Sequence, residues 1–165
     1  MSSPAIELLI DFPNKDTGVR LGRLLDKAIQ LDRALKGTLQ VLEPDTDSLK
    51  IIAHRGFDEA FLRHFETVKR FDSSACGRAF GTGNLVTIPD ILEDEAFRPN
   101  REVVLVNGIR SVKCIPVVGS DDRLEGVLAT HSPWVRWDWE RDNTRHVAAE
   151  IAVVFAEFRA GLKGT

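Results

Sequence analysis

The strongest constraint on the fold is a pair of apolar runs in the second half of the chain. Residues 111–118 and 124–131 are each typical of a β-strand, and the polar turn 119–123 joins them. Two strand-like runs on either side of a short turn predict a β-hairpin. We therefore expect an antiparallel sheet, against which the helices of the chain must pack.

The first third of the chain predicts an irregular arm, a helix and a second hairpin. Residues 1–15 contain two prolines and show no periodicity, whereas a helix is expected from Asp16 or Thr17 to a C-cap at Gly37. Residues 37–43 and 49–54 predict two strands around a turn-rich segment. The apolar stripe of the helix consists of Leu21, Leu24, Leu25, Ala28, Leu31 and Leu35.

Short helices and one edge strand are predicted between the two hairpins. Asp58 is expected to cap a short helix, and a second one is expected to follow Ser73 or Ser74 and to end at residues 81–83. Residues 85–88 predict a strand that Pro89 ends, which places it at a sheet edge. A further helix is then expected between an Asn100 cap and Gly108.

A long helix over residues 138–163 is expected to close the chain, and it is more apolar than one contact with a sheet requires. We expect one stripe to cover the sheet and the other to face a partner, which predicts a homodimer through the terminal helices. The first stripe consists of Val147, Ile151, Val154 and Phe158, and the second of Ala148, Ala152, Phe155 and Leu162.

The composition narrows the class of protein. A chain of 165 residues is expected to form one domain, and a net charge of −3 provides no basic surface for nucleic acid. The sequence shows no signal peptide and no apolar run of the length that spans a membrane, which predicts a cytoplasmic protein with no membrane partner. Two cysteines are too few for a disulfide framework, and no pattern of metal ligands is present.

Four segments, in this order and spacing, resemble the GAF domains of bacterial sensor histidine kinases and related signalling regulators. The resemblance covers most of the chain and implies a single domain over residues 16–163. It implies an α+β fold, with a central antiparallel sheet of five to six strands. The N- and C-terminal helices would lie on one face, and short helices and loops would form a pocket on the other. The segments are residues 74–83, residues 88–94 with Phe97, residues 108–116 and residues 124–131.

The resemblance implies a ligand but does not identify one, so the cofactor is unknown. Members of the family use the pocket for cyclic nucleotides, bilins, haem or small acids. The cysteine that carries a bilin is commonly followed by histidine, but Cys76 is followed by Gly77. Asn14 and Lys15 precede the first helix and cannot supply the Asn-Lys part of a cyclic-nucleotide signature. The acidic residues from Asp90 onward have no histidine or cysteine beside them, so no metal or haem site is predicted.

A basic side chain is the most informative feature of the predicted pocket. Lys113 lies in the middle of a predicted strand, where a lysine must pair, reach solvent or meet a ligand. If its face of the sheet carries the pocket, Lys113 and Arg110 would suit an anionic molecule; otherwise the lysine extends past the sheet edge. The residues predicted to line the pocket are Phe57, Phe71, Ser74, Cys76, Phe80, Asp90, Phe97, Arg110, Lys113, Ile115 and His131.

The two cysteines support alternative interpretations. Cys76 is expected at the start of a short helix, where free backbone N–H groups would stabilise a thiolate, but the sequence favours a buried apolar cysteine over this interpretation. Cys114 is expected in the core of a strand. One branch of the GAF family reduces free methionine sulfoxide with cysteines, so a redox enzyme remains an alternative.

The function that the sequence predicts is therefore a non-catalytic GAF sensor domain. It would bind a small polar or anionic molecule and relay this event through its terminal helices to a dimer mate or a signalling partner. The alternatives are the thiol-dependent reductase and a dimerisation module that binds no ligand.

Overall fold

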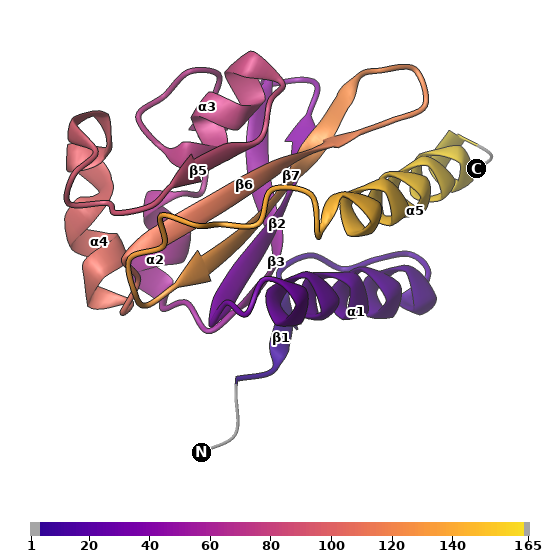
Figure 1. The fold of residues 1–165 in the computed structure, drawn as a ribbon. Helices are drawn as coiled ribbons and strands as arrows, with labels where there is room; N and C mark the ends of the chain where they lie inside the picture. The colour runs from indigo at the N-terminus through magenta and orange to yellow at the C-terminus, as the bar shows by residue number, and fades with distance from the viewer. Residues whose placement is uncertain (1–3, 164–165) are drawn as a thin grey trace.

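The computed structural model describes residues 4–163, which form an antiparallel sheet with helices on both faces (Figure 1). Within this range the sheet has seven strands in the order β1-β3-β2-β7-β6-β5, and β4 pairs with β3. This is one or two strands more than predicted, because β1 and β4 are too short to show a sequence period. The strands are β1 (Ile6–Leu8), β2 (Lys36–Glu43), β3 (Ser48–Arg55), β4 (Val68–Lys69), β5 (Val86–Ile88), β6 (Ser111–Val118) and β7 (Leu124–Ser132).

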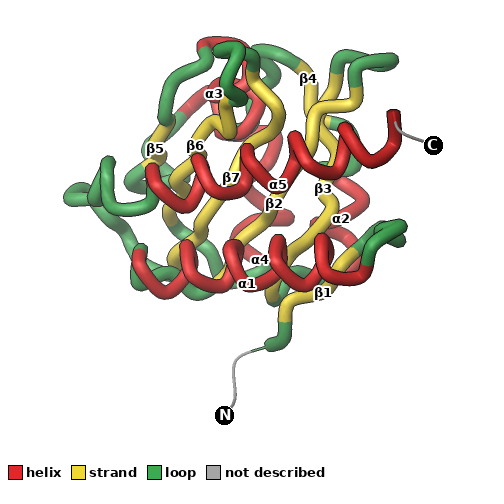
Figure 2. The backbone as a smooth tube through the Cα atoms, turned by 90° about the vertical axis from the view of Figure 1, so that its right-hand side faces the viewer, coloured by secondary structure: helices red, strands yellow, loops and turns green. Residues whose placement is uncertain are grey.

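The long terminal helices lie side by side on one face of the sheet, as Figure 2 shows. These are α1 (Lys15–Leu31) and α5 (Arg145–Lys163), and they share a hydrophobic core with that face. A second core fills the opposite face beneath the short helices. This arrangement confirms the predicted fold class. The short helices are α2 (Glu59–His64), α3 (Ala75–Thr82), the 3₁₀ helix η1 (Glu95–Asn100) and α4 (Arg101–Val106).

The helix α1 is shorter than predicted. It begins after Asn14, whose side chain accepts a hydrogen bond from the backbone N–H of Asp16, and it ends at Leu31. Arg33 has a left-handed φ of 51°, which turns the chain away from the helix axis. The predicted C-cap at Gly37 is therefore wrong. Gly37 lies in β2, where a Cβ atom would come within 2.9 Å of the Ala129 carbonyl oxygen.

Part of the predicted N-terminal arm is a strand. Ile6 pairs with Arg55 and Leu8 with Ala53, so β1 extends the sheet beyond β3. The prediction of an irregular arm over residues 1–15 is wrong for this strand and for Lys15, the first residue of α1. Backbone hydrogen bonds to β3 define the strand, and three residues are too few for an alternating pattern to reveal it.

The C-terminal helix begins at Arg145 and not at the predicted Asp138. The segment before it remains a loop because its side chains are engaged elsewhere. The Asn143 amide donates a hydrogen bond to the Leu31 carbonyl, and the Arg136 guanidinium lies 3.8 Å from the centre of the buried Trp139 ring.

Both apolar stripes of α5 are largely covered within the chain. Their members up to Phe155 pack against the sheet and α1, and the half-buried Phe158 contacts the ring of Phe12. Val153, which lies outside both stripes, is 56% exposed. The surplus of apolar surface that predicted a dimer is thus largely used inside this fold. The buried members are Val147, Ala148, Ile151, Ala152, Val154 and Phe155; the side chain of Leu162 lies outside the described residues.

The caps of the short helices follow the prediction in two cases out of three. Asp58 accepts a hydrogen bond from the N–H of Phe61, and Ser74 accepts one from the N–H of Gly77. Asn100 precedes α4, but its side chain makes no capping bond. Its amide instead donates to the Ser73 hydroxyl, and its Oδ1 lies 2.9 Å from His64 Nε2.

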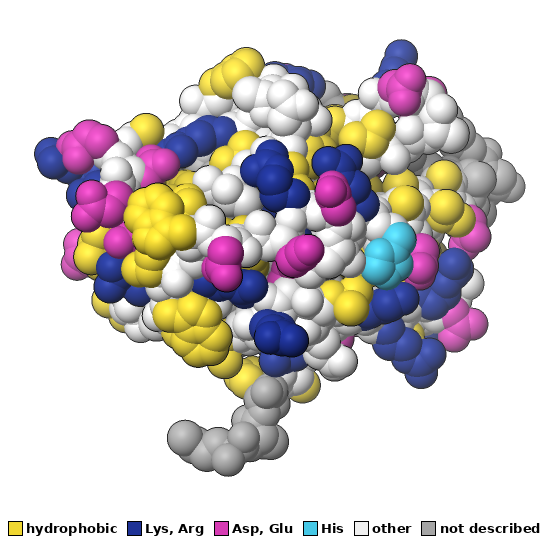
Figure 3. Space-filling view, viewed as in Figure 1, with side chains coloured by type: hydrophobic (Ala, Val, Ile, Leu, Met, Phe, Trp, Pro, Cys, Tyr) yellow, Lys and Arg dark blue, Asp and Glu magenta, His cyan; other side chains and the backbone are white. Residues whose placement is uncertain are grey.

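The surface on the side shown in Figure 3 carries both basic and acidic side chains, and hydrophobic side chains lie between them. Charge on this face is therefore of both signs. None of the helices within residues 4–163 combines the length and the apolar character that a membrane crossing requires.

Gly126 allows β7 to pass close to β2, and this contact yields a first prediction. A Cβ atom at this position would come within 2.1 Å of the carbonyl oxygen of Gln40, which is backbone and cannot move aside. We expect Gly126→Ala to lower the free energy of unfolding by about 1–3 kcal/mol, measured by denaturant titration.

Gly22→Ala is the matched control for this substitution. The added Cβ atom would lie 3.3 Å from the side chain of Ile6, and alanine favours a helix interior by about 0.5–1 kcal/mol over glycine. Equal stabilities of the two variants would contradict the proposed backbone clash at Gly126.

Candidate functional site

A small cavity of about 30 Å³ lies between the sheet and the short helices. This volume has room for about two water molecules. Four residues predicted for the pocket lie in its lining, namely Ser74, Cys76, Phe97 and His131. Their part in ligand binding stays a prediction. The full lining consists of Thr38, Gln40, Ile51, Phe61, Phe65, Ser74, Ala75, Cys76, Phe97, Val104, Val112 and His131.

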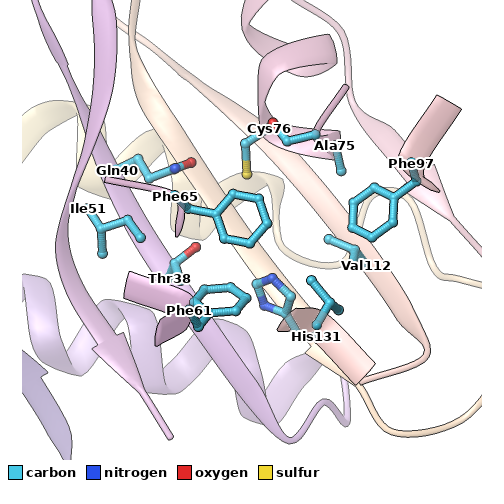
Figure 4. Close-up of a pocket in the computed structure, with 12 residues that line it drawn as sticks. Thr38, Gln40, Ile51, Phe61, Phe65, Ala75, Cys76, Phe97, Val112 and His131 are labelled. Carbon is cyan, nitrogen blue, oxygen red and sulfur yellow. The ribbon is translucent and has the colours of Figure 1, made fainter. Parts of the chain in front are cut away.

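Strands form the floor of this cavity, and short helices form its roof (Figure 4). Thr38 and Gln40 are two residues apart on β2, so both side chains leave the same face of the strand. Val112 on β6 lies opposite His131 on β7 in the register of the sheet. The phenylalanine rings of the roof come from α2 (Phe61), from the residue that follows it (Phe65) and from η1 (Phe97).

Two buried polar groups in the lining have no partner among the residues that the structure describes. Gln40 Oε1 and His131 Nδ1 accept or donate no hydrogen bond there, although Gln40 is only 2% and His131 only 5% exposed. Figure 4 shows both side chains directed into the space enclosed by the aromatic rings. Buried polar groups are nearly always paired, and leaving one unpaired costs about 1–3 kcal/mol. The cavity therefore offers two free hydrogen-bonding positions.

The imidazole of His131 is neutral at physiological pH. Burial lowers its pKa to about 3, and the nearby positive charge of Lys36 acts in the same direction, whereas a hydrogen bond to the Lys36 backbone opposes both. The rings of Phe57 and Phe61 meet the imidazole edge to face, with centroids 4.8 Å and 6.0 Å away. Burial among these rings therefore outweighs the hydrogen bond to the Lys36 backbone, which alone favours a charged histidine.

Two thiols meet at one wall of the cavity. Cys76 Sγ on α3 lies 3.0 Å from Cys114 Sγ on β6, and both cysteines are free and buried. Burial raises the pKa of the Cys114 thiol well above its ordinary value, and the contact with Cys76 raises it further. Cys76 reaches the cavity, whereas Cys114 lies behind it in the sheet.

No cluster of three or more histidine, cysteine, aspartate or glutamate side chains suited to a metal ion occurs within the described part of the chain. The chemistry that the cavity offers is thus hydrogen bonding, apolar contact and thiol chemistry.

Comparison with known proteins supplies the family. A sequence model described as "GAF domain" matches residues 23–156, which is most of the chain. The chain belongs to the GAF family. No curated protein matches this GAF domain.

Solved structures share the fold of this GAF domain at low sequence identity. A domain assigned to a two-component sensor histidine kinase of Sinorhizobium meliloti is 13% identical, with a TM-score of 0.70 over 88% of this chain and 94% of that one. A GAF domain region assigned to a membrane protein of Geobacter sulfurreducens is 14% identical, with a TM-score of 0.69 over 88% of this chain and 95% of that one. The free methionine-R-sulfoxide reductase of Neisseria meningitidis, whose structure was solved with its substrate, is 17% identical. Its TM-score is 0.66 over 94% of this chain and 98% of that one.

The predicted basic residues of the pocket lie elsewhere in this GAF domain. Lys113 is completely buried on the opposite face of the sheet, where its Nζ donates to Asp32 Oδ1 at 2.9 Å and to Asn143 Oδ1 at 2.8 Å. Ile115 shares that face and packs with the terminal helices. The alternation along β6 is as predicted, but the cavity lies on the face of Val112 and Cys114. Placing Lys113 and Ile115 in the pocket was therefore wrong.

Arg110 and Asp90 form an ion pair with each other outside the cavity. Arg110 Nη2 lies 3.0 Å from both carboxylate oxygens of Asp90, whose Oδ1 also accepts the backbone N–H of Leu92. The predicted roles of both residues in the pocket are wrong, because each is the other's partner in the loop at the end of the sheet.

Three predicted phenylalanines have different positions. Phe57 is buried behind the lining and stacks on Phe61 at 3.7 Å, so it supports the roof. Phe80 is buried in the core and lies beneath the Arg70 guanidinium. Phe71 is 68% exposed, so its predicted place in the pocket is wrong. Its left-handed φ of 59° turns the ring outward over Gly81.

The polar residues of β2 were not predicted as part of the site. Thr38 and Gln40 occupy alternate positions in a strand that was correctly predicted, and their polarity on a buried face was the available signal. The apolar members of the lining gave no such signal, because they have the same character as core residues. These are Ile51, Phe61, Phe65, Ala75, Val104 and Val112.

Proposed function

We propose that this GAF domain is a non-catalytic sensor module that acts in the cytoplasm and binds a small molecule in the cavity beneath its short helices. The observation that carries the proposal is the pair of unpartnered polar atoms, Gln40 Oε1 and His131 Nδ1, in a lining that is otherwise mostly apolar. Ligand sites typically combine an apolar wall with a few convergent polar groups. We propose neither nucleic acid nor a membrane as a partner.

The ligand that we propose is polar but uncharged, so of the polar or anionic molecule that the sequence predicts we keep only the polar alternative. The lining contains no lysine, arginine, aspartate or glutamate, and His131 is neutral. An anion in such a cavity would be desolvated without a counter-charge, which is unfavourable. Because the cavity has a volume of only about 30 Å³, a ligand larger than water requires Phe61, Phe65 or Phe97 to move outward.

The route for a signal runs through the sheet. His131 faces the cavity, and its neighbour Thr130 faces the terminal helices, where its hydroxyl donates to Asp32 Oδ2 at 2.7 Å. Asp32 is the C-cap of α1. A ligand would shift the population of helix arrangements only if it binds one arrangement more tightly than the other. We propose that this shift reaches a dimer mate or another partner protein through α1 and α5.

Ligand binding is tested by the stability of the domain in the presence of small uncharged molecules. A ligand at 100 times its Kd should add about 2.7 kcal/mol to the free energy of unfolding. Gln40→Leu should weaken its binding about tenfold, because one buried hydrogen bond is lost. Gln30→Leu is the control, because Gln30 is exposed on α1 and its side-chain amide donates a hydrogen bond to Asp26 of the same helix. Equal affinity for the two variants would contradict the proposed site.

The thiol pair favours a second candidate, a cysteine-dependent reductase. The supporting observation is the 3.0 Å separation of the two sulfurs at the wall of the cavity. Methionine sulfoxide reduction by the purified protein, abolished in Cys76→Ser, would support this candidate. A folded Cys76→Ser variant with unchanged reductase activity would remove it.

A dimerisation module without a ligand is the third candidate. Native mass spectrometry of the purified protein separates it from a sensor, because it reports both a retained molecule and the number of subunits. A dimer with no retained molecule, combined with no stabilisation across the ligand library, would favour this candidate over the sensor.

A further inference from the structure

The two cysteines of this domain are placed as a reacting pair. They lie 38 residues apart in the chain, yet their sulfur atoms are separated by 3.0 Å. One sulfur comes from the first turn of α3 and the other from the middle of β6, so the contact joins a short helix to the central sheet. Figure 4 shows the Cys76 sulfur directed toward the cavity.

We propose that Cys76 and Cys114 form an oxidisable dithiol, which a hydroperoxide that enters the cavity converts into an intramolecular disulfide. This is a modification of the domain itself and requires no turnover of a sulfoxide substrate. It is also independent of the uncharged ligand proposed above, since it depends only on the two sulfurs and on access to one of them.

The chemistry proceeds in two balanced steps. In the first, Cys76 Sγ attacks one oxygen of the hydroperoxide, the O–O bond breaks, and the thiol proton goes to the departing hydroxide or alkoxide, giving water or an alcohol together with Cys76 sulfenic acid. In the second, Cys114 Sγ attacks the sulfur of Cys76, the S–O bond breaks, and the Cys114 proton leaves with the hydroxide as water. The two thiols lose two electrons and two protons in total, which reduce the peroxide.

The order of attack follows from burial. Cys76 lines the cavity and retains 9% exposure, whereas Cys114 is completely buried behind it. Burial also raises the pKa of Cys114, which disfavours the thiolate that would be needed for the first attack. Cys76 is therefore the sulfur that meets the oxidant, and Cys114 is the resolving thiol.

The backbone around Cys76 holds this geometry. The N–H of Gly77 donates to Ser74 Oγ at 2.9 Å, and the Ser74 hydroxyl in turn donates to Asp72 Oδ1 at 2.5 Å. A Cβ atom on Gly77 would meet Asp72 Oδ1 at 2.0 Å, so α3 begins in close contact with the preceding turn. The pair is thus pre-organised, and oxidation would tie α3 to β6 at the cavity wall.

The test treats the folded, reduced protein with hydrogen peroxide, the smallest hydroperoxide and one of a size suited to a cavity of about 30 Å³. Free thiols are then blocked by alkylation, and the product is digested with trypsin without reduction. Cleavage after Arg70, Arg78, Lys113 and Arg123 places the two cysteines in separate peptides, residues 71–78 and 114–123. We expect these peptides to be joined, with a mass lower than their sum by two hydrogen atoms, and to separate after reduction.

Two variants test the order of the steps and keep the proposal falsifiable. In Cys114→Ala, the sulfenic acid of Cys76 should accumulate and be trapped by dimedone, because no resolving thiol is present. In Cys76→Ser, Cys114 should stay unmodified in the folded protein. Circular dichroism establishes that each variant is folded.

Three outcomes would overturn the proposal. The first is that peroxide treatment of the folded wild type yields the two cysteine peptides separately alkylated, with no disulfide between them. The second is a disulfide between two copies of the same peptide. The third is oxidation of Cys76 beyond sulfenic acid while Cys114 stays a free thiol. None of them bears on ligand-dependent stabilisation, which the Gln40 experiment measures separately.

Discussion

Replacing Lys113 with methionine is expected to lower the free energy of unfolding by about 3–5 kcal/mol, because it leaves the buried charge of Asp32 uncompensated. Both side chains are completely inaccessible to solvent, and their charged atoms are 2.9 Å apart. The remaining hydrogen bond from Thr130 to Asp32 cannot replace the lost cation. Denaturant unfolding of the wild type and the variant measures the effect.

A double variant and a surface control define the origin of this loss. Lys113→Met combined with Asp32→Asn should be more stable than Lys113→Met alone, because the amide removes the buried charge and can still accept from Thr130. Lys50→Met should change the free energy of unfolding by no more than about 0.5 kcal/mol, since the exposed Lys50 lies 3.7 Å from Glu43 at the surface. A similarly small change for Lys113→Met would contradict the buried pair.

The same network connects the elements that the proposed signal must cross. Asp32 follows α1, Lys113 belongs to β6, and Asn143 precedes α5. The Arg136 guanidinium donates to the backbone carbonyl of Asp32 at 2.5 Å, which joins the loop before α5 to the end of α1. Loss of Lys113 is therefore expected to loosen the terminal helices as well as the sheet.

Acidification is expected to destabilise the domain through His131, by about 2 kcal/mol between pH 7 and pH 5 and by about 4 kcal/mol in all by pH 3. The folded-state pKa is about 3, whereas a histidine in the unfolded chain has its ordinary pKa of 6.5. Between these values the unfolded chain binds a proton that the folded chain excludes, so stability falls as the pH falls. Denaturant unfolding at pH 7 and at pH 5 measures the first part of the loss.

His131→Gln is the variant that isolates this effect. It should lose most of the pH dependence between pH 7 and pH 5, because glutamine does not titrate. Part of the dependence will stay, since burial also lowers the pKa of His54, and this outweighs the opposing effect of Glu7. An unchanged loss of stability in His131→Gln would contradict the assignment. The aspartates with lowered pKa values act in a different range, below about pH 4.

Much of the fold was predictable because its determinants are local. Residues 111–118 and 124–131 show the alternation and the turn of a hairpin, and the structure places both strands within one residue of the predicted bounds. Ser74 and Gly83 mark α3 through cap chemistry that depends only on neighbouring backbone groups. The start of α5 was mispredicted because distant partners, and not helix propensity, hold the preceding loop.

The candidate site was less predictable, because alternation along a strand distinguishes its two faces without showing what covers each. The sequence could show that Lys113 and Cys114 point in opposite directions. It could not show that Asp32, 81 residues away, would meet the lysine, or that Cys76 would meet the cysteine. The same limit applies to Gln40 and His131, which come from different strands.

By itself, the sequence determined most of the longer local elements and their order, the family and the two faces of the central hairpin. These follow from short-range periodicity, capping and turn chemistry, which neighbouring residues set. Only the tertiary structure decided which face carries the cavity, where the buried charge finds its partner, and which two thiols meet. The reason is physical: pairing of strands and packing of helices bring together side chains whose separation along the chain carries no information about their contact.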